Sequence, residues 1–301
     1  MQTAEQPPAI ASDHARRGMS GRARSRAASA LLLAPAAAAL VLFFVVPLVQ
    51  ILIRSFTDPT VSFQNYATLF TDGSTLRVLG RTLTIGLIVA IATLLLAYPY
   101  TYVMCHTTPV TRAIMFTIVL IPFWTSMLAR NYAWYILMQR GGVIHKFFDM
   151  IGIPDVVLLR TSTGVAIVMV GVLLPFMVLP LYSVLSQIDP RLLSASQSLG
   201  ATRRATFLQI YIPLSRPGII SGVALVFILA LGFYITPALL GAPQDALIAQ
   251  LIAIRTQKLL DFGGAGAMGI LLLAVTALVL LLGQKLSGRG ARALVAAGRT
   301  D

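Results

Sequence analysis

Six long apolar runs, none of which contains a charged side chain, dominate the sequence. A helix needs about 20 apolar residues to cross the hydrocarbon core of a membrane, which is about 30 Å thick. The runs cover Leu31–Ile53, Thr82–Met104, Ala113–Ala129, Ser162–Gln187, Pro217–Gly241 and Gly263–Gly283. The third run is short, and we expect Asn131–Met138 to prolong it while the Arg130 side chain extends toward the membrane surface.

The composition agrees with a membrane-embedded chain. Hydrophobic residues make up 57% of it and charged residues only 11%, against about a quarter charged in soluble domains. Backbone N–H and C=O groups find no partners in lipid, so a spanning segment must be a helix or part of a closed barrel. The runs lack the alternation of barrel strands. The sequence therefore predicts an all-α polytopic membrane protein with six transmembrane helices, and it excludes a water-soluble globule.

The positions of the basic residues indicate how the chain crosses the membrane. If the N-terminus is cytoplasmic, the cytoplasmic segments hold 14 of the 23 Lys and Arg residues but only four of the ten acids. Basic segments favour the cytoplasmic side, so we place both termini there. We expect residues 1–30 to be a disordered basic tail near the membrane lipid, residues 31–286 to be the six-span domain and residues 287–301 to be a cytoplasmic tail. A nucleic-acid partner is not expected.

Two outer loops are expected to contain short structured pieces. Residues 54–81 mix turn signals such as Asp58-Pro59 and Asp72-Gly73 with apolar residues, which indicates a short interfacial structure. The stretch Val143–Ile151 is amphipathic and follows Gly141-Gly142. We expect it to fold back onto the membrane surface.

One inner connection, from Ile188 to Arg216, is far longer than two neighbouring spans require. Asp189 is a good N-cap, Pro190 suits the first helical position, and Gly200 can end a helix in the left-handed conformation. We therefore predict a helix here, outside the membrane. Its weakly apolar face, suited to docking in a groove of another protein, consists of Leu192, Ala195, Ser196 and Leu199.

A second helix is expected directly after the first. Thr202 can cap it, Arg203 and Arg204 are expected to be exposed, and the helix should run through Phe207 to Ile212 before Pro213 breaks it. From spacing alone, however, a loop that packs beneath its own bundle is more common than a docking helix, and both readings stay open at this point.

The spacing within this connection resembles a known motif. Ser194-Ala195-Ser196 is followed after three residues by Gly200 and after nine more by Ile210-Tyr211-Ile212-Pro213. This pattern, placed before the fifth of six spans, resembles the EAA loop of ABC importer permeases. Ser194 stands where the family usually has glutamate, and Ile212 stands where it has leucine. The first change removes a charge, for which we expect Arg203 and Arg204 to supply compensating polar contacts.

The resemblance implies a type I ABC importer permease fold in a bacterial inner membrane. Residues 188–216 would then be a coupling loop that seats in a cleft of a cytoplasmic ATPase dimer and transmits its closure to the spans by alternating access. The other implied partners are a second permease subunit, which we expect to be a sister chain, and a periplasmic substrate-binding protein. The residues implied in coupling are Asp189, Leu192, Ser194, Ala195, Ser196, Leu199, Gly200, Arg203, Arg204, Ile210 and Pro213.

A broader resemblance narrows the solute. The stretches 128–134 (Leu-Ala-Arg-Asn-Tyr-Ala-Trp), 141–144 (Gly-Gly-Val-Ile) and 232–241 are similar to permeases of the spermidine/putrescine subfamily. His145 stands where relatives often have asparagine. The resemblance implies a polyamine as solute, while ferric ion and opine-like amines, which similar permeases carry, remain alternatives.

Aromatic residues within or bordering the spans are the candidates for the substrate path, because aromatic faces attract ammonium groups. They are Trp124, Tyr132, Trp134, Tyr135, Phe233 and Tyr234. An interfacial aromatic belt explains Tyr132, Trp134 and Tyr135 equally well, and Trp124 and Phe233 could pack against neighbouring helices. No Asp or Glu lies inside any run, so strong cation selectivity is not expected in this subunit.

The sequence argues against an enzyme and against a cofactor on this chain. It has no G-x-x-x-x-G-K-[ST] motif for nucleotide phosphates and no G-x-S-x-G motif, so ATP and Mg²⁺ would be bound by the separate ATPase. His14, His106 and His145 are scattered, and a lone Cys105 forms no metal cluster or intrachain disulfide. The rival readings are an ion-coupled secondary transporter and a passive channel. The runs contain no carboxylate or histidine to bind a coupling ion, and a channel leaves the long capped connection unexplained.

Overall fold

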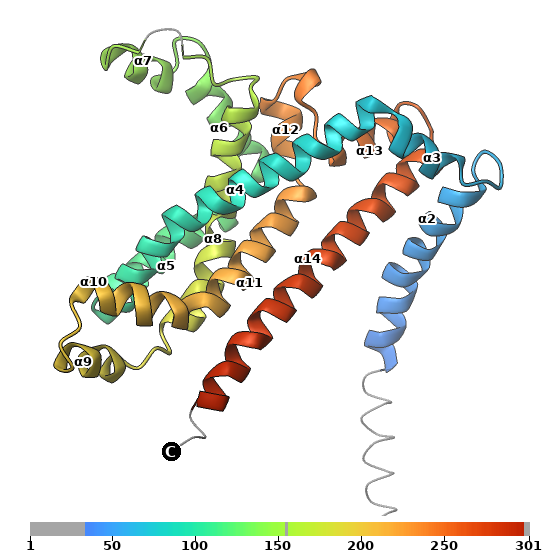
Figure 1. Cartoon of the computed structure of the whole chain (residues 1–301). Coiled ribbons are helices and arrows are strands. Elements are labelled where there is room, and N and C mark those ends of the chain that lie inside the picture. Colours follow the sequence, from blue (N-terminus) through green and yellow to red (C-terminus); the bar gives the residue numbers. More distant parts are fainter. Residues whose placement is uncertain (1–33, 154–155, 298–301) are drawn as a thin grey trace, which may run out of the picture.

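The computed structural model of the chain describes residues 34–153 and 156–297, and every regular element in this part is helical (Figure 1). Two of the elements, η1 and η2, are π-helical turns, and η3 is a 3₁₀ turn. In chain order the elements are η1 Val41–Val45, α2 Val46–Thr57, α3 Gln64–Thr71, α4 Gly73–Cys105, α5 Pro109–Trp124, α6 Met127–Met138, α7 Val143–Met150, α8 Ser162–Leu185, α9 Pro190–Ser198, α10 Arg203–Thr206, η2 Phe207–Tyr211, α11 Ile212–Leu231, α12 Ile235–Leu240, η3 Pro243–Asp245, α13 Ile248–Gln257 and α14 Phe262–Ala297.

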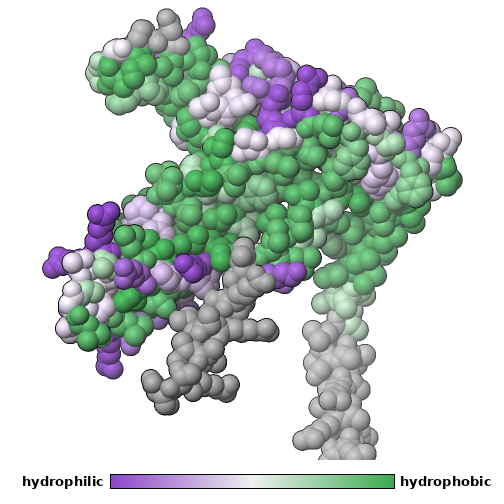
Figure 2. Space-filling view, in the orientation of Figure 1, coloured by the Kyte–Doolittle hydropathy of each residue, from purple (hydrophilic) through white to green (hydrophobic). Residues whose placement is uncertain are grey.

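The helices provide five candidate membrane spans, or six if the bent α5–α7 segment counts as one, against the six that the sequence predicts. Five continuous stretches are long and apolar enough to cross a membrane, and α5 with α6–α7 forms a sixth that is bent by 99°. The five are Ala34–Thr57, Gly73–Cys105, Ser162–Leu185, Arg203–Leu231 and Phe262–Lys285. Figure 2 shows a hydrophobic belt around the middle of the molecule, with hydrophilic residues gathered at its two ends.

The two ends of the bundle carry different elements. The helices α9 and α10 lie at the same end as the start of α2 and the end of α14, while α3, α7, α12 and α13 lie at the opposite end (Figure 1). The short structures predicted within residues 54–81 and 143–151 are confirmed as the helices α3 and α7. The helix α13 was not predicted; with ten residues it is too short to appear as a membrane-spanning run.

The core lies where α4, α8 and α11 pack against one another. Val89 of α4, Met177 of α8 and Val226 of α11 are fully buried there. The close contact between α8 and α11 depends on small residues of α11: a Cβ atom added at Gly222 would lie 2.6 Å from the Met177 sulfur. Glycines at such positions let two membrane helices pack backbone to backbone.

Replacing Gly222 with valine should therefore destabilise the bundle. We expect a loss of about 1–3 kcal/mol, the usual cost of overpacking a core, seen as a lower Tm of the detergent-purified chain. Gly171→Val is the matched control, because it adds the same side chain to α8 at an exposed position with no atom within 4 Å. Equal melting temperatures for the two variants would contradict this account of the packing.

The third span is broken, which corrects the prediction of a run prolonged through Asn131–Met138. α5 ends at Trp124 and α6 begins at Met127, with Thr125 in an extended conformation between them. Arg130 does not reach for the membrane surface. Its guanidinium folds back and donates to the carbonyl oxygens of Pro122 and Thr125, which have no helical partner beyond the break.

Two further predictions about the fifth span are wrong. The run Pro217–Gly241 is not one helix, because α11 ends at Leu231 and a short α12 follows after Gly232 and Phe233. Pro213 does not end the helix before it, since α10, η2 and α11 form a continuous stretch from Arg203 to Leu231. The π-turn η2 ends at Tyr211, two residues before the proline, and its wider hydrogen-bonding pattern accommodates a residue that lacks an N–H group.

Candidate coupling loop and substrate path

The connection after α8 folds as a capped helix outside the spans, as its sequence predicts. The Asp189 carboxylate accepts a hydrogen bond from the backbone N–H of Arg191 at 2.8 Å, and Pro190 occupies the first turn. α9 ends at Ser198, and Gly200 follows with a φ of +89°, a conformation that favours glycine. The local rules of capping thus account for both ends of this helix.

One side of α9 carries exposed side chains. Leu199 is 90% exposed, and Leu192 and Ala195 are also exposed. Ser194 is exposed as well, and its hydroxyl donates to the carbonyl oxygen of Pro190. Leu192, Ala195 and Leu199 form an apolar edge, which we call the docking edge.

Ser196 does not belong to the docking edge, which corrects the predicted face. Its side chain is buried, and its hydroxyl is hydrogen-bonded to the Thr206 hydroxyl at 2.8 Å. Helical spacing alone could not reveal this partner, because it lies ten residues further along the chain. The pair fastens α9 to α10 on the side that faces the bundle.

The second helix of the loop begins as the sequence predicts. The Thr202 hydroxyl accepts from the backbone N–H of Ala205, and Arg203 and Arg204 are exposed. The π-turn η2 then continues the helix through Ile210, which is half-buried, toward Pro213 in the first turn of α11. The second part of the loop is therefore continuous with the helix that enters the bundle, from Arg203 to Leu231.

Aromatic side chains connect η2 to the C-terminal end of α4. The Phe207 ring lies 5.7 Å from that of Tyr102 and 5.6 Å from that of Tyr211, and the Tyr211 ring lies 5.1 Å from that of Tyr102. His106 stacks on Tyr102 at 4.3 Å, and Tyr98 reaches Phe207 at 6.3 Å. We call these five residues the aromatic cluster. It is a second contact between the loop and the bundle, which the sequence analysis did not find because the residues come from elements about one hundred positions apart.

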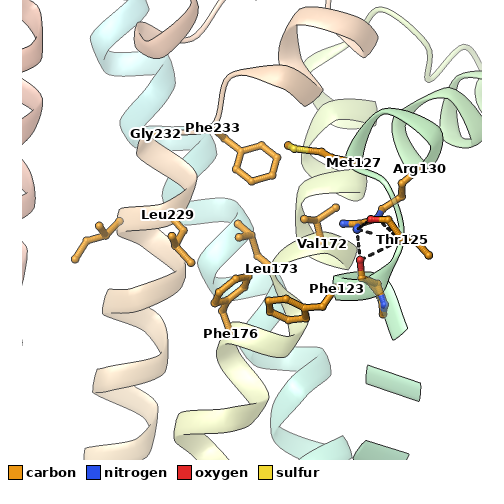
Figure 3. Close-up of a pocket in the computed structure, with 12 residues that line it drawn as sticks. Phe123, Thr125, Met127, Arg130, Val172, Leu173, Phe176, Leu229, Gly232 and Phe233 are labelled. Carbon is orange, nitrogen blue, oxygen red and sulfur yellow. Dashed lines mark hydrogen bonds between the residues drawn. The ribbon is translucent and has the colours of Figure 1, made fainter. Parts of the chain in front are cut away.

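The predicted path residues are not gathered in one place. Phe233 lines a cavity of about 500 Å³ at the break of the third span, together with residues of α5, α6, α8 and α11. Figure 3 shows Phe233, Phe123 and Phe176 around this space, with Arg130 held against Thr125 at its edge. Trp124 is 91% exposed and is not among the lining residues.

The remaining candidates lie elsewhere. Trp134 packs against the core as a partly buried residue, whereas Tyr132 and Tyr135 are exposed on α6 and line a different cavity. Tyr234 is exposed at the start of α12. Within the described residues, no group of three His, Cys, Asp or Glu side chains is placed to hold a metal ion.

Arg130 is a positioning residue that the sequence analysis did not identify as such. Besides the two carbonyl oxygens, its guanidinium donates to the Thr125 hydroxyl at 3.1 Å. A positive charge at the carbonyl end of a helix is also favoured by the helix dipole. A lone charged residue between two apolar segments is the only sequence signal that points to it.

Replacing Arg130 with methionine should loosen the break between α5 and α6. The carbonyl oxygens of Pro122 and Thr125 lose their charged donor, and hydrogen bonds to charged groups contribute about 1.5–3 kcal/mol. We expect a lower Tm of the purified chain and faster proteolysis near residue 125. Arg130→Lys keeps the charge but carries its donors on a single nitrogen, so its Tm should lie between those of wild type and Arg130→Met. A methionine variant as stable as wild type would contradict the assigned role.

Comparison with known proteins agrees with this architecture. Residues 21–293 match the family described as the binding-protein-dependent transport system inner membrane component. The chain belongs to this family. It is therefore a multi-pass inner-membrane permease subunit of an ABC importer, and not an enzyme.

Three relatives illustrate the relationship. The permease is 34% identical over 230 residues to the spermidine/putrescine transport system permease protein PotB of Escherichia coli (strain K12), covering 76% of this chain and 83% of that protein. It is 33% identical over 236 residues to PotB of Haemophilus influenzae, covering 76% and 82%. Its fold resembles a chain of a bacterial alginate ABC transporter, solved with an alginate pentasaccharide-bound periplasmic protein, with a TM-score of 0.72 at 20% identity and coverage of 88% and 95%.

Proposed function

We propose that this permease forms half of the translocation path for a polyamine such as spermidine or putrescine. A periplasmic binding protein delivers the solute, a sister permease completes the path, and a cytoplasmic ATPase dimer drives the cycle. The polyamine assignment draws on the relatives named PotB. The mechanism draws on one observation above all, the exposed docking edge on a helix that is fastened to the bundle from its other side.

The docking edge is the proposed contact with the ATPase. Leu199 and Leu192 present apolar side chains outside the spans, where exposed apolar groups mark contact surfaces. Arg203 and Arg204 border this edge and can pair with acidic groups of a partner. ATP and Mg²⁺ stay on the ATPase, and this chain contributes no cofactor site. In this arrangement α9, α10 and both termini are cytoplasmic, while α3, α7 and α13 face the periplasm.

The two routes out of the loop carry the movement. When the ATPase subunits close on ATP, they displace α9, and the Ser196–Thr206 hydrogen bond moves α10 with it. The continuous helix from Arg203 to Leu231 then changes its tilt, and the aromatic cluster moves the inner end of α4. Because α4, α8 and α11 form one packed core, they move as a unit relative to the sister subunit.

The test is reconstitution. The chain is purified with its native partners in mild detergent, identified by mass and placed in proteoliposomes with labelled putrescine or spermidine. We expect an ATPase, a second six-span protein and uptake that requires both ATP and the binding protein. Uptake by the chain alone, without ATP, would instead establish a secondary transporter or a channel, and ATP-driven uptake of other solutes only would refute the polyamine assignment.

A further inference from the structure

A second cavity, of about 370 Å³, lies beside α6 and shares no lining residue with the one at the break of the third span. Its walls come from two elements that are far apart in the sequence, α6 and α12. The lining residues are Leu128, Asn131, Tyr132, Tyr135 and Leu239. Four of the five are apolar or aromatic, so the single amide, that of Asn131, decides what the cavity can bind.

Asn131 carries an acceptor that nothing in the described chain satisfies. The residue is 1% exposed, and its Nδ2 atom donates to the carbonyl oxygen of Met127 at 2.8 Å. That bond fixes the orientation of the amide, because the reversed amide would set two acceptor oxygens against each other. The Oδ1 atom is thus held in place, buried and without a hydrogen-bond partner among the described residues. A buried acceptor of this kind costs free energy until a donor reaches it.

Two tyrosine rings lie beside this amide. The rings of Tyr132 and Tyr135 are nearly parallel, with an interplanar angle of 4° and centroids 6.3 Å apart, and both side chains are exposed. The face of an aromatic ring attracts a cation. The cavity therefore combines a hydrogen-bond acceptor with two cation-attracting faces and apolar walls.

The one charged neighbour on the same helix does not oppose a cation here. Arg130 directs its guanidinium to the end of α5 and lines the other cavity, not this one. No carboxylate lines this cavity either. A cation would be held by dipoles and rings alone and so released readily, as a site crossed during transport requires.

We propose that the Asn131 cavity is a transient site for the primary ammonium group of an alkylamine. The ammonium group donates a hydrogen bond to Asn131 Oδ1 and lies against the rings of Tyr132 and Tyr135, while the alkyl chain contacts Leu128 and Leu239. An anion would place acceptor against acceptor, and a lipid acyl chain would leave Oδ1 without a donor. Because Oδ1 is buried, the exposed side chains beside it must shift to admit the ligand. The inference rests on the proposed function as an amine importer and adds the site to it.

The experiment uses the complete importer in proteoliposomes and measures labelled putrescine and spermidine taken up per ATP hydrolysed. This ratio is chosen because the binding protein dominates the apparent affinity for the solute, whereas a lost transit site lets ATP cycles pass without transport. For Asn131→Leu we expect about a fivefold fall in the ratio at unchanged ATP hydrolysis, the size of one modest ammonium contact. Tyr135→Leu should fall similarly, and Tyr135→Phe, which keeps the ring, should stay within about twofold of wild type.

The outcomes distinguish a failure of the proposed function from a failure of the proposed site. If the wild-type importer moves no amine, the proposed function fails. If it moves amines and Asn131→Leu and Tyr135→Leu keep the wild-type ratio, the function stands and the site is refuted. A parallel loss of uptake and ATP hydrolysis, or loss of the sister permease on purification, would show that Asn131 has a structural role and would also refute the site. Should Asn131→Leu fail to insert, the Tyr135 pair decides alone, since that side chain is exposed on α6.

Discussion

Replacing Leu199 with aspartate should abolish ATP-driven uptake while the chain still inserts and folds. Leu199 is 90% exposed at the tip of the docking edge, so a carboxylate there disturbs no packing within the described chain. In a cleft of the ATPase it would be a desolvated charge without a partner. Loss of a central contact of this kind weakens binding by about 2 kcal/mol or more, which is at least about thirtyfold.

The measurement is retention of the ATPase during purification, followed by uptake in proteoliposomes. Val61→Asp is the matched control, because Val61 is 85% exposed at the opposite end of the bundle, between α2 and α3. It should leave both quantities unchanged. If Leu199→Asp also retains the ATPase and its transport, the docking edge does not contact the ATPase and the proposed coupling is wrong.

Replacing Phe207 with alanine should uncouple ATP hydrolysis from transport. Phe207 faces Tyr98, Tyr102 and Tyr211 in the aromatic cluster, so its loss separates η2 from α4. Aromatic pairs contribute about 0.5–1.5 kcal/mol each beyond the area that they bury. We expect the ATPase to bind and to hydrolyse ATP at close to the wild-type rate, while uptake per ATP falls by about tenfold.

The control removes an aromatic pair away from the coupling route. Phe116 of α5 contacts Tyr182 of α8 edge to face, with ring centroids 4.7 Å apart. Phe116→Ala should lower the Tm yet leave uptake per ATP close to wild type. Equal losses of coupling in the two variants would mean that general destabilisation, not the aromatic cluster, explains the phenotype.

The parts of the structure that local rules govern could be predicted from the sequence. The six spans follow from continuous apolar runs, and α9 follows from Asp189, Pro190 and Gly200, whose roles depend only on neighbouring residues. The family assignment followed from the spacing of the same loop and is shown by the comparison.

Features that depend on partners distant in sequence could not be predicted in the same way. The break at Thr125 lies between two apolar segments and is stabilised by Arg130 from the next helix, so composition carries no sign of it. Ser196 looked like a surface residue because its partner, Thr206, belongs to another helix. The π-turn before Pro213 has no compositional signature, and the proline alone indicated a helix end. The last two of these three corrections concern the connection between the loop and the spans.

The π-turn η2 also sets the rotational phase between the inside and the membrane parts of one helix. A π-turn holds one residue more than the α-helical turn that it replaces. If all five residues 207–211 wound as an ordinary α-helix instead, the lipid- and core-facing pattern of α11 would stay intact. Everything before them would, however, be rotated by about 100° around the helix axis. The docking edge would then point away from its proposed partner although each of its residues is retained. This short segment therefore determines the direction in which the loop faces the ATPase.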